Sequence, residues 1–381
     1  MKAVPPARVT GVKPGEAAFQ AADHAHMAQA LRLAARGLDT TTPNPRVGCV
    51  LVREGRVVGE GWHERAGGPH AEAVALQAAA GQAAGATAYV TLEPCSHHGR
   101  TPPCAEALVA AGVAHVVAAM QDPNPGVAGQ GIARLRAAGI ATRVGLMEAE
   151  ARELNIGFVS RMTRGRPWLR VKIAASLDGK TALGNGVSQW ITGPDARRDG
   201  HRWRARSCAI LTGIGTLRDD DPRLTVREVE ASRQPLRVVV DSRLRMDPQA
   251  KILDGAPVLV ATAMDDAARR RALEARGASV VVLPDAGGKV DLARLAAELG
   301  ARGTNEILVE SGINLNSALL AAGLVDELLI YLAPHLLGDG GRGMLDLGEV
   351  TRMEGRLALD VRETRMIGPD LRILARPAIR P

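Results

Sequence analysis

The stretch Pro69-His70-Ala71-Glu72 is followed by Glu93-Pro94-Cys95 and then by Cys104. One imidazole and two thiolates can hold a tetrahedral Zn²⁺ and leave its fourth position open for water. A glutamate two residues after the histidine can carry protons without binding the metal. Zinc deaminases attack the amidine carbon of a base with this set of groups, and His-x-Glu with Pro-Cys is their known signature. The stretch therefore predicts the metal ligands His70, Cys95 and Cys104, with Glu72 as the catalytic proton carrier.

The residues around the motif predict where each ligand lies. Ala75 and Ala79 follow Glu72 at helical spacing, which predicts that the histidine begins a helix. Residues 86–92 read as a strand that ends just before Cys95. Pro103 suits a helix start, so Cys104 is expected near a helix N-terminus, where partial positive charge favours a thiolate.

Plainer interpretations of these residues stay open at this point. The two cysteines could be ordinary buried thiols, and the histidine could be structural. A closed structural zinc site would need a fourth protein ligand, which His97 or His98 could supply. The catalytic interpretation is favoured because His-x-Glu and Pro-Cys occur together in a strand–helix context. A zinc ion held there would lower the pKa of its bound water to about 7.

Length and composition limit the class of protein. A chain of 381 residues with 46% apolar residues predicts about two globular domains. No apolar run approaches the roughly 18 residues of a membrane span, no signal peptide is recognisable, and residues 1–20 read as a disordered tail. Four cysteines do not suggest a disulfide framework; Cys49 and Cys208 read as core thiols, and zinc thiolates need a reducing, cytoplasmic setting.

The net charge of +7 permits several kinds of partner. A basic chain can bind nucleic acid, an anionic membrane surface or a phosphorylated small molecule. The arginines are scattered along the sequence, so charge alone does not choose among these partners.

In the first half, strands alternate with helices, which predicts an α/β fold. A helix is expected over 22–36 and a hairpin over 47–60, with its turn at Glu54-Gly55. Asn44 lies between two prolines, and its amide could read a base edge or only support a turn. Gly59 and Gly61 would allow close approach of the backbone to a ligand.

The second half reads as a further α/β domain after a helical linker over 149–166 and a boundary at 164–167. No phosphate-binding motif fits, because Ala174 stands where a P-loop needs glycine and Arg218 where a dinucleotide fingerprint needs it. Arg243 and Arg245 follow a predicted strand and could accept a 2′-phosphate. Gly312 opens a predicted helix and could present N–H groups to pyrophosphate, although each feature could equally be an ordinary loop.

Longer motifs carry a resemblance to a known family. They are Cys95-Ser-His-His-Gly-Arg-Thr-Pro-Pro-Cys104, Gln121-Asp-Pro-Asn-Pro125, Ala175-Ser-Leu-Asp-Gly-Lys180, Ser188-Gln-Trp-Ile-Thr192, Asp220-Asp-Pro-Arg-Leu-Thr-Val-Arg227 and Val309-Glu-Ser-Gly312. From about residue 22 to 375, the chain resembles the bifunctional riboflavin-biosynthesis deaminase–reductases of bacteria. The resemblance implies a cytidine-deaminase-like three-layer α/β/α domain over 21–165 and a dihydrofolate-reductase-like α/β domain over 166–381.

The resemblance also implies activities and contacts. The expected reactions are zinc-dependent deamination of 2,5-diamino-6-(5-phosphoribosylamino)pyrimidin-4-one and NADPH reduction of the ribosyl group to ribityl, in a homodimer or larger oligomer that binds neither nucleic acid nor membrane. Substrate contacts would fall on Ser188, Arg204, Leu224, Arg227 and Glu310, with Asn44 as the candidate in the deaminase half. Cofactor contacts would fall on Ala174, Trp190, Thr216, Asp220, Ser242, Gly312, Ile313, Asn314, Leu315, Asn316, Ser317 and Ala318.

Two other classes of function compete with this one. A nucleic-acid base deaminase would need aromatic stacking platforms, and the chain has only two Phe and two Tyr. A structural zinc protein with a degenerate second domain would have neither activity. Matching motifs in both halves favour the bifunctional enzyme.

Overall fold

The computed structural model describes residues 18–96 and 103–378. These residues form two compact units, one of residues 18–37 and 46–154 and the other of residues 38–45 and 155–378. Most of the expected tail over 1–20, together with His97 and His98, lies outside the described residues. No helix within the described ranges is long and apolar enough to cross a membrane.

The first unit is built on a five-stranded sheet with the order β2-β1-β3-β4-β5. The strand pairs β2–β1 and β1–β3 are antiparallel, and β3–β4 and β4–β5 are parallel. The hairpin turn lies at Glu54-Gly55, as predicted, and both residues have positive φ. The strands are β1 (Gly48–Arg53), β2 (Arg56–Trp62), β3 (Thr87–Val90), β4 (His115–Ala118) and β5 (Ala141–Val144).

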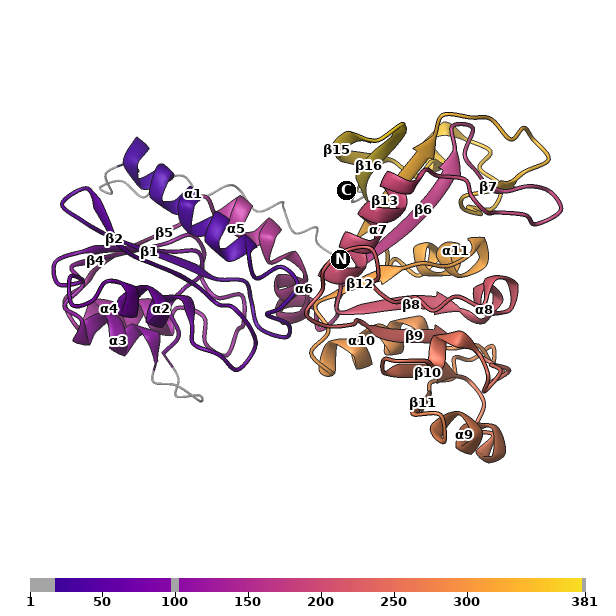
Figure 1. Cartoon of the computed structure of the whole chain (residues 1–381), viewed down its shortest axis with the longest axis horizontal. Helices are drawn as coiled ribbons and strands as arrows, with labels where there is room; N and C mark the ends of the chain where they lie inside the picture. Colours follow the sequence, from indigo (N-terminus) through magenta and orange to yellow (C-terminus); the bar gives the residue numbers. More distant parts are fainter. Residues whose placement is uncertain (1–17, 97–102, 379–381) are drawn as a thin grey trace, which may run out of the picture. The chain divides into compact units, whose positions relative to one another are not determined.

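Helices cover both faces of this sheet, which confirms the three-layer arrangement (Figure 1). Helices α1 (Ala21–Ala35) and α5 (Glu148–Leu154) lie on one face, and α2 (Ala71–Ala78), α3 (Cys104–Ala110) and α4 (Gln130–Ala137) lie on the other. The second face is packed with small apolar residues, among them Ala75, Ala88 and Leu108.

Two glycines of β2 have a different purpose from the one expected. A Cβ on Gly61 would lie 2.4 Å from the carbonyl oxygen of Ala71, and one on Gly59 would lie 2.3 Å from that of Ala75. The space beside these glycines is therefore filled by the backbone of α2, and the prediction that they approach a ligand is wrong. Their role is to let α2, which carries Glu72, lie directly against β2.

The second unit contains a nine-stranded sheet with the order β11-β10-β9-β8-β12-β6-β13-β16-β15. The strands from β11 to β13 are parallel, and β16 and β15 continue the sheet in antiparallel pairing. Its strands are β6 (Trp168–Ser176), β8 (Ala209–Gly213), β9 (Leu236–Val240), β10 (Val258–Thr262), β11 (Ala278–Val282), β12 (Glu306–Val309), β13 (Glu327–Ala333), β15 (Leu359–Ile367) and β16 (Asp370–Pro377), while β7 (Lys180–Ala182) and β14 (Arg342–Gly343) form a separate pair.

Helices pack on the large sheet through apolar clusters. Leu295 of α10 and Leu319 of α11 belong to the main core, and Leu217 of α8 and Leu273 of α9 belong to a second cluster. Ala196 and Trp203 of α7 join a third cluster with residues of β12 and β13. The helices are α6 (Ile156–Arg164), α7 (Pro194–Arg206), α8 (Ile214–Asp220), α9 (Ala267–Glu274), α10 (Leu292–Ala301) and α11 (Ile313–Ala321), with short 3₁₀ turns at Lys251–Leu253 and Met353–Gly355.

The expected linker over 149–166 is two helices, α5 and α6, that belong to different units. Helix α6 belongs to the second unit, and two of its side chains bind residues of that unit. Arg161 donates to Asn305 at 2.7 Å, and Arg164 pairs with Asp326 at 2.7 Å. The compact units thus change over at residue 154, whereas the expected domains change over at residue 165.

Candidate active sites

The three predicted zinc ligands lie together in the first unit. His70 caps the N-terminus of α2, Cys95 follows the loop after β3, and Cys104 is the first residue of α3. The His70 Nδ1 lies 3.2 Å from the Cys104 Sγ and 3.5 Å from the Cys95 Sγ, and the three ligand atoms lie within 4.8 Å of one another. A tetrahedral zinc ion with ordinary bond lengths would separate a nitrogen and a sulfur ligand by about 3.5 Å. The donor set therefore fits zinc in both chemistry and spacing.

The electrostatics of the two thiols also suit a cation. The pKa of Cys95 is lowered to about 4, first because Cys104 donates to its sulfur and also because His70 does. The Cys104 N–H, at the start of α3, donates to the same sulfur at 3.3 Å. Cys104 keeps its own proton, because donation to the Cys95 sulfur raises the pKa of the Cys104 thiol. A bound divalent cation would replace this proton and stabilise both thiolates.

Glu72 lies beside this cluster in the first turn of α2. Its residue is 3% exposed, and burial raises the pKa of its carboxyl to about 7. A carboxyl with a pKa near neutrality can both accept and release a proton under ordinary conditions. Among the described residues, His70, Cys95 and Cys104 form the only cluster of side chains that could hold a metal ion. Glu72 does not belong to this cluster.

Sequence reasoning missed a second carboxylate, Glu93, that supports the site. Its buried side chain accepts four backbone hydrogen bonds, which come from Asp122 (3.1 Å), Gly129 (2.9 Å), Gly131 (2.8 Å) and Ile132 (3.2 Å). The last three donors surround the N-terminus of α4, where a negative charge is favourable. Glu93 therefore fixes the loop after β4 against the chain that carries Cys95.

In the second unit, four predicted cofactor residues meet at one edge of the sheet. Ala174 lies toward the end of β6, and Thr216, Ser242 and Gly312 follow β8, β9 and β12. These strands are adjacent and parallel, in the order β9-β8-β12-β6, so their carboxyl ends form one edge. Open parallel sheets bind their ligands at this edge. The topology thus brings together residues that lie far apart in the sequence.

Gly312 is the N-cap of α11 and is exposed, and a Cβ there would meet nothing within 4 Å. The first N–H groups of an α-helix have no partner within the helix, so the backbone at Ile313 and Asn314 can receive a pyrophosphate. Asn316 is different, because its buried side chain donates to the Ser311 carbonyl at 3.0 Å. At the start of α11, the groups suited to a dinucleotide are therefore the main-chain N–H groups rather than the side chain of Asn316.

A charged cluster lies beside this edge. Glu310, just after β12, accepts two hydrogen bonds from the Arg204 guanidinium, one of them at 3.0 Å, and lies 3.9 Å from the Lys172 ammonium. Burial alone would raise the pKa of Glu310, but the charges of Arg204 and Lys172 outweigh it and lower that pKa to about 2. Lys172 was missed from the sequence; the available signal was that Arg170 and Lys172 alternate within an otherwise apolar strand, which places both on one face.

The remaining predicted contacts lie on less regular segments. Leu224 is buried with φ of +49°, and Arg227 is exposed at the end of the same irregular segment. Trp190 is 71% exposed and stacks on Arg197, while Ser188 is half-buried and Asp220 ends α8. Asn44 lies in the segment 38–45, which belongs to the second unit, and its N–H donates to the Thr41 carbonyl at 2.8 Å in a turn. Its role as a base-reading amide stays a prediction.

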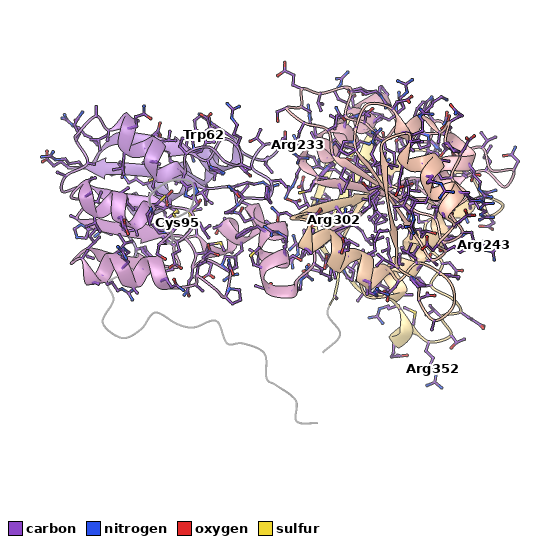
Figure 2. All side chains as sticks on the ribbon, turned by 90° about the horizontal axis from the view of Figure 1, so that it is seen from below. Trp62, Cys95, Arg233, Arg243, Arg302 and Arg352 are labelled. Carbon is purple, nitrogen blue, oxygen red and sulfur yellow. The ribbon has the colours of Figure 1, made fainter. Side chains whose placement is uncertain are left out.

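The side chains of the two arginines after β9 reach outward. Arg243 and Arg245 are both exposed, and Figure 2 shows Arg243 at the periphery of the second unit, whereas Cys95 lies among the elements of the first. Ser242 uses its hydroxyl to accept from the Val290 N–H at 3.0 Å. The exposed guanidinium groups of Arg243 and Arg245 are therefore accessible to a 2′-phosphate, which stays a prediction.

Comparison with known proteins finds a match for each half of the chain. The family model of the RibD C-terminal domain matches residues 167–373, and that of the cytidine and deoxycytidylate deaminase zinc-binding region matches residues 20–120. The riboflavin biosynthesis protein RibD of Escherichia coli is 49% identical over 361 residues, which cover 92% of this chain and 98% of that protein. Its counterpart in Haemophilus influenzae is 46% identical over 379 residues, with 94% and 98% covered.

Solved structures extend the likeness to three dimensions. A RibD structure from Acinetobacter baumannii matches with a TM-score of 0.87 at 43% identity, covering 94% of this chain and 99% of that one. A diaminohydroxyphosphoribosylaminopyrimidine deaminase/5-amino-6-(5-phosphoribosylamino)uracil reductase from Thermotoga maritima matches with a TM-score of 0.83 at 32% identity, with the same coverage. The chain therefore belongs to the RibD family of riboflavin biosynthesis and combines a zinc-dependent deaminase with an NADPH-dependent reductase.

Proposed function

We propose that residues 21–165 deaminate 2,5-diamino-6-(5-phosphoribosylamino)pyrimidin-4-one and that residues 166–381 reduce the resulting 5-amino-6-(5-phosphoribosylamino)uracil to its ribityl form. The observation that carries the first half is the cluster of His70, Cys95 and Cys104 beside the buried Glu72. The Thermotoga maritima protein, whose name states both activities, aligns over 94% of the chain. This supports the same substrates here.

In the deaminase half, His70, Cys95 and Cys104 would hold the zinc ion, and their geometry leaves its fourth position without a protein ligand among the described residues. Zinc supplies Lewis acidity that makes water nucleophilic near neutral pH. Glu72 would take a proton from the attacking water and give it to the ring nitrogen. It would then take the proton of the newly added hydroxyl and give it to the amino group, which leaves as ammonia while the carbonyl forms. Burial of Glu72 suits both steps, because its raised pKa lowers the cost of carrying the proton.

In the reductase half, the predicted contacts divide into two groups. Ala174, Thr216, Ser242 and the N-terminus of α11 would hold NADPH at the sheet edge, with Trp190 and Asp220 on the surrounding segments. NADPH supplies a hydride, which is expected to add to C1 of the opened sugar. Glu310, just after β12, lies 3.9 Å from Lys172 of β6, and these two side chains would orient the polar substrate through charge-assisted hydrogen bonds.

The phosphate of the substrate would be bound by Arg227 together with Ser188 and the main chain at Leu224. The Arg204 guanidinium is already paired with Glu310, and it also donates to the Thr225 carbonyl at 3.0 Å. The Arg227 side chain, by contrast, is exposed and has a hydrogen bond to the Thr225 hydroxyl at 3.1 Å. The difference in exposure and pairing supports Arg227 as the residue that binds the phosphate and Arg204 as the residue that orients Glu310.

An oligomer is supported by the free edge of the large sheet. Within the part of the chain that the structure describes, β15 has a neighbouring strand on one side only. Its exposed side chains include Val361 and Met366, which are 56% and 59% exposed. An unpaired strand edge with apolar side chains favours pairing with another chain. We infer a homo-oligomer that uses this edge, and light scattering of wild type and Val361→Lys tests it: the substitution should yield monomers, and an unchanged mass would exclude this edge.

A cytoplasmic location and a small-molecule substrate complete the proposal. All four cysteines are free thiols in the structure, and the zinc thiolates require reducing conditions. Trp190 is the one aromatic residue among the strongly exposed large apolar side chains of the described residues, so the stacking platforms of a nucleic-acid deaminase find no support there.

The test is incubation of the purified protein with the diaminopyrimidine phosphate, with and without NADPH, followed by mass spectrometry of the products. Wild type should give the deaminated uracil alone without NADPH and the ribityl product with it. Glu72→Gln should retain zinc and lose deamination, and Arg227→Ala should spare deamination and impair reduction. A Glu72→Gln protein that deaminates at the wild-type rate would refute the assigned proton carrier.

A further inference from the structure

His201 has no part in the proposed contacts, yet it lies at the reductase site. It is buried on α7, one turn before Arg204, and is 6% exposed. The Arg227 N–H donates to its Nδ1 at 3.3 Å, and its Nε2 lies 3.9 Å from the Glu228 carboxylate. The histidine therefore bonds the main chain of the residue whose side chain is proposed to grip the substrate phosphate.

The bonded segment, residues 224–227, belongs to no helix or strand. Side chains take the place of a neighbouring strand along it. Arg204 donates to the Thr225 carbonyl at 3.0 Å, and Gln234 accepts from the Val226 N–H at 2.8 Å and donates to the Val226 carbonyl at 3.1 Å. His201 completes the series at Arg227. Three consecutive residues are thus held through their backbones while the Arg227 guanidinium stays exposed.

The bond between His201 and Arg227 requires one tautomer of the imidazole. Because the Arg227 N–H is the donor, Nδ1 must be without a proton, and the proton lies on Nε2, facing Glu228. Burial lowers the pKa of His201, the charges of Arg204 and Arg227 lower it further, and Glu228 and Glu310 oppose them, leaving it at about 4. The imidazole is therefore neutral near pH 7 and can accept this bond.

We propose that His201 and Gln234 form a backbone clamp that positions Arg227 for the phosphate of the substrate, so that both are positioning residues of the reductase. The inference depends on the proposed phosphate contact of Arg227. A long arginine side chain on an unsupported loop would lose its directed geometry, since a small displacement of its Cα moves the guanidinium away from a fixed anion.

The clamp should affect substrate binding more than the chemical step. His201→Leu removes the acceptor and leaves the Arg227 N–H without its partner, so the KM of reduction for the phosphorylated substrate should rise about tenfold, with kcat within about twofold. His201→Asn is the matched control, because the Asn Oδ1 can occupy the position of Nδ1 and accept the same bond; its KM should stay within about threefold of wild type. Gln234→Ala, at an exposed position, should raise KM in the same way without loss of buried packing.

Three comparisons separate a clamp from a general structural effect. Deamination measures the integrity of the first unit and should be unchanged in every variant. The dephosphorylated substrate should show the same KM in wild type and His201→Leu. In an Arg227→Ala background, His201→Leu should add less than about twofold, because residues that act through one another are not additive.

The outcomes distinguish the clamp from the phosphate contact. If Arg227→Ala raises KM and His201→Leu does not, the clamp is wrong and the phosphate contact stands. If Arg227→Ala leaves KM unchanged, the phosphate contact is wrong and the clamp is overturned with it. An equal rise in KM for the dephosphorylated substrate, or an equal effect of His201→Asn and His201→Leu, would also overturn the clamp.

Discussion

Replacing Glu93 by glutamine should weaken both the stability of the first unit and its zinc affinity. The carboxylate is 5% exposed and accepts four backbone N–H groups between 2.8 and 3.2 Å. Its Oε1 serves Gly131 and Ile132, and its Oε2 serves Asp122 and Gly129. Glutamine is nearly isosteric, but its amide nitrogen is a donor and cannot accept from either N–H of one pair.

The magnitude follows from this count. Two of the four bonds are lost, and a hydrogen bond to a charged group contributes about 1.5–3 kcal/mol, so the free energy of unfolding should fall by about 3–6 kcal/mol. Whole domains are stable by only about 5–15 kcal/mol, so the loss should be plainly measurable. Zinc affinity should fall by about 10–100-fold, because supporting residues around a metal site usually have effects of that size.

Differential scanning calorimetry measures the stability, and competition with a chromophoric chelator measures the zinc affinity. Glu106→Gln is the matched control, because Glu106 pairs with Arg134 at the surface at 2.5 Å and its side chain is 32% exposed. Such a pair contributes about 0–1 kcal/mol. A Glu93→Gln protein that unfolds and binds zinc like the Glu106→Gln control would refute the role assigned to this carboxylate.

Three further predictions concern single contacts. Gly131→Ala should destabilise the first unit by at least about 1–3 kcal/mol in calorimetry, because its Cβ would lie 1.9 Å from the Pro94 carbonyl oxygen. Glu310→Gln should impair reduction and leave deamination intact in the coupled assay, since it leaves the buried Arg204 guanidinium without its charged partner at a cost of about 3–5 kcal/mol. The free energy of unfolding of the second unit should fall by up to roughly 3 kcal/mol as the pH drops from 6.5 to 4, because over that range His201 binds a proton only in the unfolded state. Denaturation at several pH values tests this, since His201→Leu should lack the part of the pH dependence that His201 contributes.

Local order in the chain explains which parts of the zinc site could be predicted. His70 and Glu72 are two residues apart, and Cys95 and Cys104 are tied to predictable strand and helix ends, so their spacing carries the geometry. Glu93 stands in the same motif, but its partners lie between residues 122 and 132. Nothing local marks such a carboxylate as a receptor for distant N–H groups, so its function was missed.

The same limit applies to Lys172 and His201 in the second unit. Lys172 faces Glu310 across adjacent strands, and His201 faces Arg227 from a helix, so each gains its meaning from a residue distant in sequence. The prediction for Gly59 and Gly61 of β2 was wrong for the opposite reason, because it assigned a functional contact where the structure has only a packing contact. A short side chain signals only that something lies close, and in this case the neighbour is the backbone of α2 rather than a ligand.

Both sites lie where strands end, but they are built from different groups. This difference explains why the zinc site could be predicted from the sequence and the cofactor site could not. In the first unit the groups that face the ligand are side chains, and a thiolate or an imidazole is visible in the sequence. At the edge formed by β9, β8, β12 and β6, the groups suited to a dinucleotide are main-chain N–H groups, such as those after Gly312, and every residue except proline has one. A site made of backbone has almost no composition of its own, so Ala174 and Thr216 could be assigned to it only by family resemblance. The sheet order then supplies the physical reason for that assignment, because it sets four distant loops beside one another.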